Sequence, residues 1–198
     1  MTDTRVDAGS IKLPAYEFIA GFESGTTADS ANWTIDQAAE LTQSATNATE
    51  GSNSLRAVMD SNLTSWNITR DTAGQFSFSF DVLIEEIGTD PDFDELRIFP
   101  NDAADSSLVG VEFHGNGPII INGSSVDSWT RDTWYTVEFR PDFGAGEITV
   151  IINGTSYGPY SISETDLKRV EIDEVQNSSG QNIVAYFDDV AENAVPSG

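Results

Sequence analysis

Apolar and polar side chains alternate strictly along much of this chain. The alternation is clearest in segment 75–86, QFSFSFDVLIEE, where Ser77, Ser79 and Asp81 share one parity. From Phe76 to Ile84 the opposite parity carries large apolar side chains: Phe76, Phe78, Phe80, Val82 and Ile84. Successive side chains of a β-strand point to opposite faces of a sheet, so the segment predicts a strand with one buried face. An amphipathic helix would instead repeat every 3.6 residues, and no long segment does so.

The same alternation recurs in short segments that are separated by turn-forming residues. It is found at 15–23, 54–60, 65–70, 95–100, 108–115, 118–123, 134–141, 147–154, 169–175 and 182–190. Asn-Gly, the preferred pair for a two-residue hairpin turn, occurs at 116–117, 122–123 and 153–154. Many short strands joined by turns predict an all-β, antiparallel two-sheet sandwich. We expect the chain to divide, in order, into a flexible arm at 1–13, one sandwich domain at 14–192 and a short tail at 193–198.

Acidic residues far outnumber basic ones. The chain has 33 Asp and Glu against 9 Lys and Arg, which gives a formal net charge of -24. The acids are spread along the whole chain, and its aromatic, β-patterned segments argue against disorder. Concentrated salt would screen the mutual repulsion of the acidic side chains to within a few ångströms. An acid-rich, Lys-poor folded chain resembles the proteins of extreme halophiles, and an ordinary acidic protein is the alternative.

Composition also excludes several functional classes. The chain has no basic stripe to neutralise phosphates, so nucleic acids and anionic membranes are disfavoured as partners. It has no Cys, which rules out disulfides and thiolate chemistry. No run of about 18 apolar residues occurs, so no membrane span is expected, and the polar start MTDTRVDAGS shows no signal peptide. A short helical turn is expected near 164–168.

Two stretches resemble a known superfamily. GFESG at 21–25, then Trp33, then ATEGSNSLRA at 48–57, resembles the opening of jelly-roll carbohydrate-binding modules. The stretch at 132–154, DTWYTVEFRPDFGAGEITVIING, followed by NIVAYFDDV at 182–190, is similar to laminin-G and concanavalin A-like domains. The resemblance implies a jelly-roll sandwich of the concanavalin A/laminin G type. Fold alone does not give function, so each site is argued separately.

The resemblance also implies a structural Ca²⁺ ion. Modules of this kind often hold one between the Phe-Glu turn and the closing Asp-Asp pair, which here are Glu23, Asp188 and Asp189. Ca²⁺ takes six to eight oxygen ligands, so these three residues would form only part of its shell. The alternative is that they are surface acids without a metal.

Sugar binding would need an aromatic platform with polar side chains beside it. The candidates lie in loops, at turns or on a polar strand: Trp66, His114, Trp129, Arg131, Tyr157 and Tyr160. For the aromatic residues the alternative is core packing, and for the single histidine it is a polar position in a loop. Trp33 and Trp134 are expected in the core.

The segment RVEIDEVQ at 169–176 poses the question of catalysis. Some sandwich-fold glycoside hydrolases carry Glu-x-Asp-x-Glu or Glu-x-Asp-x-x-Glu on one strand. Here Glu171 and Asp173 share a parity, but Val175 and Gln176 stand where a third carboxylate would, and Glu174 faces the other way. Without an acid/base partner the nucleophile has no group to protonate the leaving oxygen. We therefore expect no enzyme activity.

These observations favour a non-catalytic glycan-binding or adhesion sandwich. Its expected setting is extracellular or on a virion surface, in a halophilic archaeon or its virus. The expected partners are host cell-surface glycans, neighbouring surface proteins or a second copy of the chain. Two alternatives stay open: a polysaccharide-degrading hydrolase or lyase on the same fold, and a purely structural virion protein that makes only protein contacts.

Overall fold

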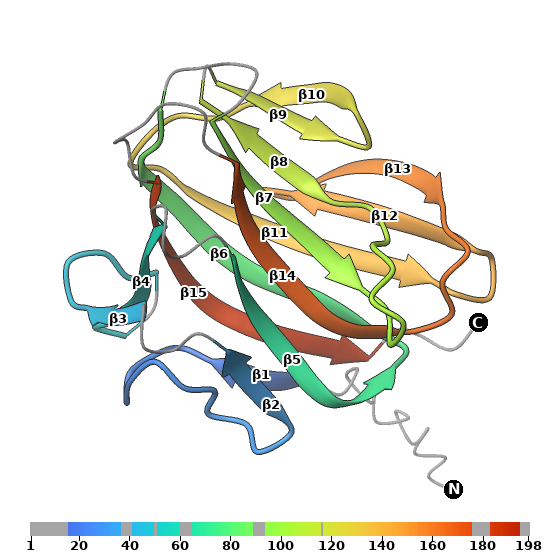
Figure 1. The fold of residues 1–198 in the computed structure, drawn as a ribbon, viewed down its shortest axis with the longest axis horizontal. Coiled ribbons are helices and arrows are strands. Elements are labelled where there is room, and N and C mark those ends of the chain that lie inside the picture. Colours follow the sequence, from blue (N-terminus) through green and yellow to red (C-terminus); the bar gives the residue numbers. More distant parts are fainter. Residues whose placement is uncertain are drawn as a thin grey trace, which may run out of the picture.

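Two antiparallel β-sheets pack face to face and enclose one core (Figure 1). The structure, a computed structural model, describes residues 16–36, 41–49, 51–59, 65–88, 94–115, 117–175 and 183–194. The fold is the predicted jelly-roll sandwich, and among these residues no helix is found. No helix there is therefore long and apolar enough to cross a membrane. The predicted arm at 1–13 lies outside the described residues.

The larger sheet has eight strands, seven of which follow one another as neighbours. Their order is β13 (Thr155–Ser161), β12 (Glu147–Ile152), β11 (Trp134–Asp142), β6 (Phe76–Glu86), β15 (Ile183–Ala194), β4 (Ser54–Met59) and β3 (Leu41–Ser44). The eighth strand, β1 (Tyr16–Ala20), pairs with the second half of β15, whereas β4 pairs with its first half. The register of β15 with β6 shifts between Asp188 and Ala191, where the two halves meet.

The smaller sheet has seven strands. Their order is β10 (Ser124–Ser128), β9 (Pro118–Ile121), β8 (Val111–His114), β7 (Glu95–Asn101), β14 (Leu167–Val175), β5 (Ser65–Gly74) and β2 (Trp33–Asp36). The helical turn expected near 164–168 is wrong, because residues 162–166 are irregular and β14 already begins at Leu167. Strand β15 runs to Ala194, slightly beyond the expected domain boundary at 192.

Alternation determines which side chains meet between the sheets. The inward rings form a connected series in which Phe80 contacts Phe78, Phe139 and Phe187 at centroid distances of 5.9, 6.4 and 6.2 Å. Trp33 is 4% exposed and packs on this series, as expected. The expectation for Trp134 is wrong, because this side chain lies half-buried on the outer face of the larger sheet. In β11 the next residue and every second residue after it face the core instead.

Two of the Asn-Gly pairs form the hairpin turns that they predict. Asn122 and Gly123 have φ of 49° and 72°, and Asn153 and Gly154 have φ of 48° and 80°. A type I′ turn requires φ above zero at both central residues, which Gly adopts without strain and Asn tolerates. These turns connect β9 to β10 and β12 to β13. Asn116 of the third pair lies outside the described residues.

Candidate functional site

Strand β14, which carries the RVEIDEVQ segment, is interior to the smaller sheet. Val170 and Ile172 are buried against the core, so Glu171 and Asp173 point to the outer face, as the alternation predicted. Glu174 has the inward parity and is 8% exposed. The strand therefore presents two carboxylates on one face.

Those carboxylates lie beside two side chains of β7. In the strand register Glu171 is opposite Phe99, and Asp173 is opposite Arg97. Arg97 forms an ion pair with Asp173, and its guanidinium carbon lies 5.6 Å from the centre of the Phe99 ring. Neighbouring strands lie about 4.8 Å apart and alternate residues about 6.6 Å apart, so these four side chains outline an area close to that of one sugar ring. We call Arg97, Phe99, Glu171 and Asp173 the β7–β14 patch.

The Phe99 ring covers the backbone that leads into β8. A Cβ atom added at Gly110 would lie 2.2 Å from the ring, so a side chain there would displace it. Phe99 is the site residue that sequence reasoning missed. Ile98 and Phe99 are consecutive apolar residues, so their run does not reveal which of them faces outward.

Glu171 is also held by neutral and charged donors. Asn101 Nδ2 donates to its carboxylate at 3.2 Å, and a guanidinium nitrogen of Arg169 lies 3.3 Å from the same oxygen. Arg169 in turn contacts Asp105 at 3.3 Å. The outer face of this sheet therefore carries a network of paired charges.

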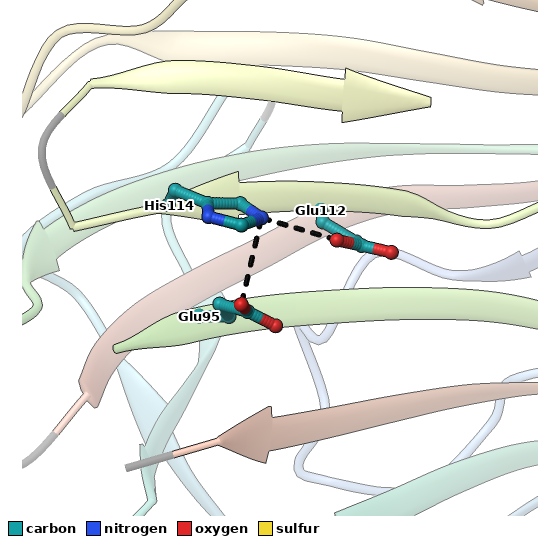
Figure 2. Close-up of side chains that lie close together, drawn as sticks. All are labelled: Glu95, Glu112 and His114. Carbon is teal, nitrogen blue, oxygen red and sulfur yellow. Dashed lines mark hydrogen bonds and ion pairs between the residues drawn. The ribbon is translucent and has the colours of Figure 1, made fainter. Parts of the chain in front are cut away.

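A second group lies on β7 and β8, next to the patch. Glu112 and His114 alternate on β8, and Glu95 is opposite His114 in the register. Figure 2 shows both carboxylates turned toward the imidazole: Nε2 lies 3.1 Å from a Glu112 oxygen and 3.6 Å from a Glu95 oxygen. Burial raises the pKa of the Glu95 carboxyl above its ordinary value. His114 opposes this rise in pKa, and the negative charge of Glu112 adds to it.

Trp129, a predicted sugar platform, instead supports His114. Its side chain is 7% exposed and packs edge-on against Phe113, with ring centroids 6.4 Å apart. The Trp129 Nε1 donates a hydrogen bond of 2.8 Å to the His114 carbonyl. The platform prediction is wrong for Trp129 and also for Trp66, which is fully buried, because both rings fill the core.

The remaining predicted sugar-binding residues lie in the loop before β11 and on the edge strand β13. Arg131 donates to the Ile87 carbonyl at 2.5 Å. The Tyr157 hydroxyl on β13 donates to Asp127 on β10 at 3.1 Å, which links the edge strands of the two sheets. Burial raises the pKa of Tyr157 and of Tyr160, and both rings are half-buried against the core. Neither tyrosine belongs to the β7–β14 patch.

Glu23, expected to be a calcium ligand, accepts hydrogen bonds from a neighbouring loop. Its carboxylate accepts from the backbone N–H groups of Ser52 and Asn53 at 2.8 and 2.9 Å. These backbone donors lower the pKa of Glu23, because they stabilise its charged form. The carboxylate therefore fixes the residues that immediately precede β4.

Asp188 and Asp189 lie at the bulge of β15. Asp188 is fully buried and accepts from the Thr49 backbone at 2.8 Å and from the Thr49 hydroxyl at 3.1 Å. The same hydroxyl lies 3.2 Å from Asp189. Within the described residues, one set of three or more His, Cys, Asp or Glu has ligand atoms all within 4.8 Å of one another, and that set is Glu95, Glu112 and His114.

Comparison with known proteins identifies a fold rather than a family. No protein-family model and no curated protein matches the chain. Among solved structures it is similar to the cellulose-induced protein Cip1, with a TM-score of 0.59 and 16% identity over 92% of this chain and 100% of that one. It is similar to a Bacillus licheniformis β-glucanase, with a TM-score of 0.57 and 10% identity over 93% and 99%. It is also similar to a sialidase, with a TM-score of 0.59 and 15% identity over 83% of this chain but only 17% of the sialidase. At these identities the likeness shows that the chain has the jelly-roll β-sandwich fold.

Proposed function

We propose that the protein is a non-catalytic glycan-binding β-sandwich whose sugar-contacting surface is the β7–β14 patch. The observation that carries this proposal is the arrangement of an aromatic ring, a guanidinium and two carboxylates on one outer face. The known proteins with this fold include one named as a β-glucanase and one named as a sialidase. Glycan binding is therefore compatible with the fold.

The chemistry of the patch suits a sugar ring. The apolar face of a pyranose packs on an aromatic ring, and its hydroxyls pair with planar polar groups that fix its orientation. Phe99 would supply the ring, and Asp173 and Glu171 would accept hydroxyl hydrogen bonds. Because Arg97 already pairs with Asp173, that carboxylate keeps its position before a ligand arrives.

A glycan array in molar salt tests the proposal. We expect Phe99→Ala to weaken binding at least about tenfold, which corresponds to about 1.4 kcal/mol. Asp173→Asn should weaken it as well, because the ion pair that orients Arg97 is lost. Trp134→Ala is the matched control, since it removes a half-buried aromatic from the outer face of the other sheet. Absence of binding to every glycan, or loss of binding only in Trp134→Ala, would contradict the proposal.

A second candidate is a polysaccharide-degrading hydrolase or lyase that uses the same face. The observation that favours it is the shared outward orientation of Glu171 and Asp173 on β14. A retaining hydrolase needs two free carboxyl groups about 5–5.5 Å apart, whereas both of these already have cationic partners. Release of reducing ends or of unsaturated sugars from polysaccharides, abolished in Glu171→Gln, would favour this candidate over simple binding.

We further propose that Ca²⁺ binds at Asp188 and Asp189, as the resemblance implied. A shared hydrogen-bond donor, the Thr49 hydroxyl, brings the two carboxylates together, and one of them is fully buried. Two adjacent carboxylates favour a cation, and Ca²⁺ would add structural stability by fixing the chain around Thr49. Glu23 fits less well as a direct ligand, because its carboxylate already accepts hydrogen bonds from two backbone amides. A melting temperature that Ca²⁺ leaves unchanged in a chelator-treated sample would exclude the site.

The proposed setting is extracellular, on a cell or virion surface of a halophilic system. Its support is the excess of acidic residues, which suits a chain that works in concentrated salt. The proposed partners are surface glycans, with neighbouring surface proteins or a second copy of the chain as alternatives. If the protein co-assembles with surface proteins but binds none of the host glycans, the purely structural alternative would replace the glycan-binding proposal.

A further inference from the structure

Two carboxylates of the outer face converge on a single imidazole nitrogen. His114 Nε2 lies 3.1 Å from Glu112 and 3.6 Å from Glu95, and the ligand atoms of all three residues lie within 4.8 Å of one another (Figure 2). An Nε2–H bond points in one direction in the ring plane, so it can serve one of these carboxylates well but not both. A proton on Nε2 can therefore neutralise only one of the two carboxylates well. A cation placed between the three side chains could contact all of them.

The distances agree with those across a metal ion. A Zn²⁺ ion binds imidazole nitrogen at about 2.0–2.1 Å and carboxylate oxygen at about 2.0–2.2 Å with tetrahedral geometry. Two such ligand atoms then lie roughly 3.4 Å apart. The observed separations from Nε2, 3.1 and 3.6 Å, lie on either side of this value.

The local charge also favours a divalent cation. Arg97 is opposite Glu112 in the register of β7 and β8, and it pairs with Asp173 on β14. The carboxylates of Glu95, Glu112 and Asp173 and the one guanidinium leave two negative charges when His114 is neutral. The three converging side chains are 14–26% exposed, so their interactions are screened less than those of fully exposed groups.

We propose that Glu95, Glu112 and His114 bind one first-row divalent transition-metal ion of the Zn²⁺ class. Imidazole nitrogen suits Zn²⁺, Cu²⁺ and Ni²⁺, whereas Ca²⁺ and Mg²⁺ favour shells of oxygen ligands. Three protein ligands leave a fourth position that faces solvent, the arrangement found in open rather than closed zinc sites. The site is distinct from the proposed calcium site at Asp188 and Asp189 on the other sheet.

The sheet holds these ligands in place before the metal arrives. Two ligands alternate on one strand, and the third is paired in register on the next, so the backbone fixes all three positions. The Trp129 indole anchors the His114 carbonyl, and the Gly115 amide donates to the Asp94 carbonyl at 2.8 Å, just beyond the strand ends. An added Cβ at Gly115 would lie 2.1 Å from the Gly88 carbonyl oxygen, so the backbone is closely packed there.

Calorimetric titration with ZnCl₂ tests the proposal on the full chain without an affinity tag. The protein would first be treated with a chelator and desalted into molar NaCl, which suppresses weak binding to surface acids. Because His114 is the only histidine and Cys is absent, no other imidazole or thiolate can contribute. We expect saturable binding of one Zn²⁺ per chain that excess Ca²⁺ does not displace.

Variants then assign the site. His114→Ala and the near-isosteric Glu112→Gln should each lower Zn²⁺ affinity more than about tenfold, since changes in the outer shell of a metal site alone cost about 10–100-fold. Glu138→Gln is the matched control, because Glu138 lies on β11 in the other sheet and should leave affinity unchanged. Circular dichroism checks that each variant is folded.

The outcomes separate this inference from glycan binding. Phe99→Ala should weaken glycan binding at least about tenfold and leave Zn²⁺ binding intact, so each proposal can fail alone. Absence of one-to-one Zn²⁺ binding, equal affinity in His114→Ala, or displacement by excess Ca²⁺ would overturn the metal-site proposal.

Discussion

Two buried tryptophans make similar ring contacts but differ at the indole nitrogen. Trp33 meets Phe76 with ring centroids 5.5 Å apart, and Trp66 meets Phe187 at 4.9 Å, each with an interplanar angle of 80°. The Trp33 Nε1 donates to Glu192 at 3.2 Å, whereas the buried Trp66 Nε1 has no hydrogen-bond partner among the residues that the structure describes. An unpaired buried donor costs about 1–3 kcal/mol. Trp66 therefore stabilises the core through its packing alone.

The pair gives a matched test. We expect Trp33→Phe to lower the free energy of unfolding by about 1–3 kcal/mol more than Trp66→Phe does. The first change removes a hydrogen bond to a carboxylate, while the second removes an unpaired donor, and both delete similar ring volume. Urea unfolding in molar salt measures the difference. Equal losses, or a larger loss in Trp66→Phe, would contradict the role assigned to the indole nitrogens.

At the scale of single residues, the sequence identified only part of the candidate sites. The shared parity of Glu112 and His114 is visible in the sequence, but their contact with Glu95 depends on the register between β7 and β8. That register depends on the irregular segment 102–110, which has no turn motif of defined length. Phe99 was missed for a different reason, because apolar residues of both parities stand side by side in its strand.

Among the elements, the strands that the sequence did not reveal share one property. The eleven alternating segments predicted all the interior strands of the two sheets, and they also predicted β1. The strands β2, β3, β10 and β13 were not predicted, and they are the end strands of the two sheets. An end strand has one neighbour and more solvent contact, so it needs less apolar alternation. β10 and β13 show this most clearly, since no residue of either is buried.

The hairpin between β12 and β13 offers a test at this scale. Gly154 has φ of 80°, where a Cβ is strained, and nothing else lies within 4 Å of the added atom. We expect Gly154→Ala to lower the free energy of unfolding by about 1–2 kcal/mol through backbone strain alone. Gly144→Ala in the preceding turn is the control, because its φ is ordinary and the nearest atom is 3.4 Å from the added Cβ. Equal effects of the two changes in denaturant unfolding would exclude this explanation.

For the whole molecule, charge repulsion outweighs ion pairing. If each of the 9 basic residues paired with a different acid, 24 of the 33 acids would still have no cationic partner. Salt weakens the ion pairs of Arg70, Arg97, Arg140 and Arg169, but it weakens the more numerous repulsions as well. The screening length falls from about 30 Å at 0.01 M salt to about 3 Å at 1 M.

We therefore expect the melting temperature to rise steeply between low and molar NaCl. Potassium chloride should act in nearly the same way, because screening depends on ionic strength rather than on the cation. Differential scanning calorimetry across this range measures the effect. A melting temperature that does not change with salt would contradict the proposed halophilic adaptation.

The pairing of β1 with β15 has a consequence for how the sandwich can be joined to other polypeptides. Tyr16 lies opposite Asn193, so the first and last strands of the described chain are hydrogen-bonded neighbours. Adjacent strands are about 4.8 Å apart. A longer polypeptide that ran in through Tyr16 and out through Ala194 would have its two flanking segments held side by side. The sandwich can thus be inserted into a surface loop of another domain without forcing that loop apart.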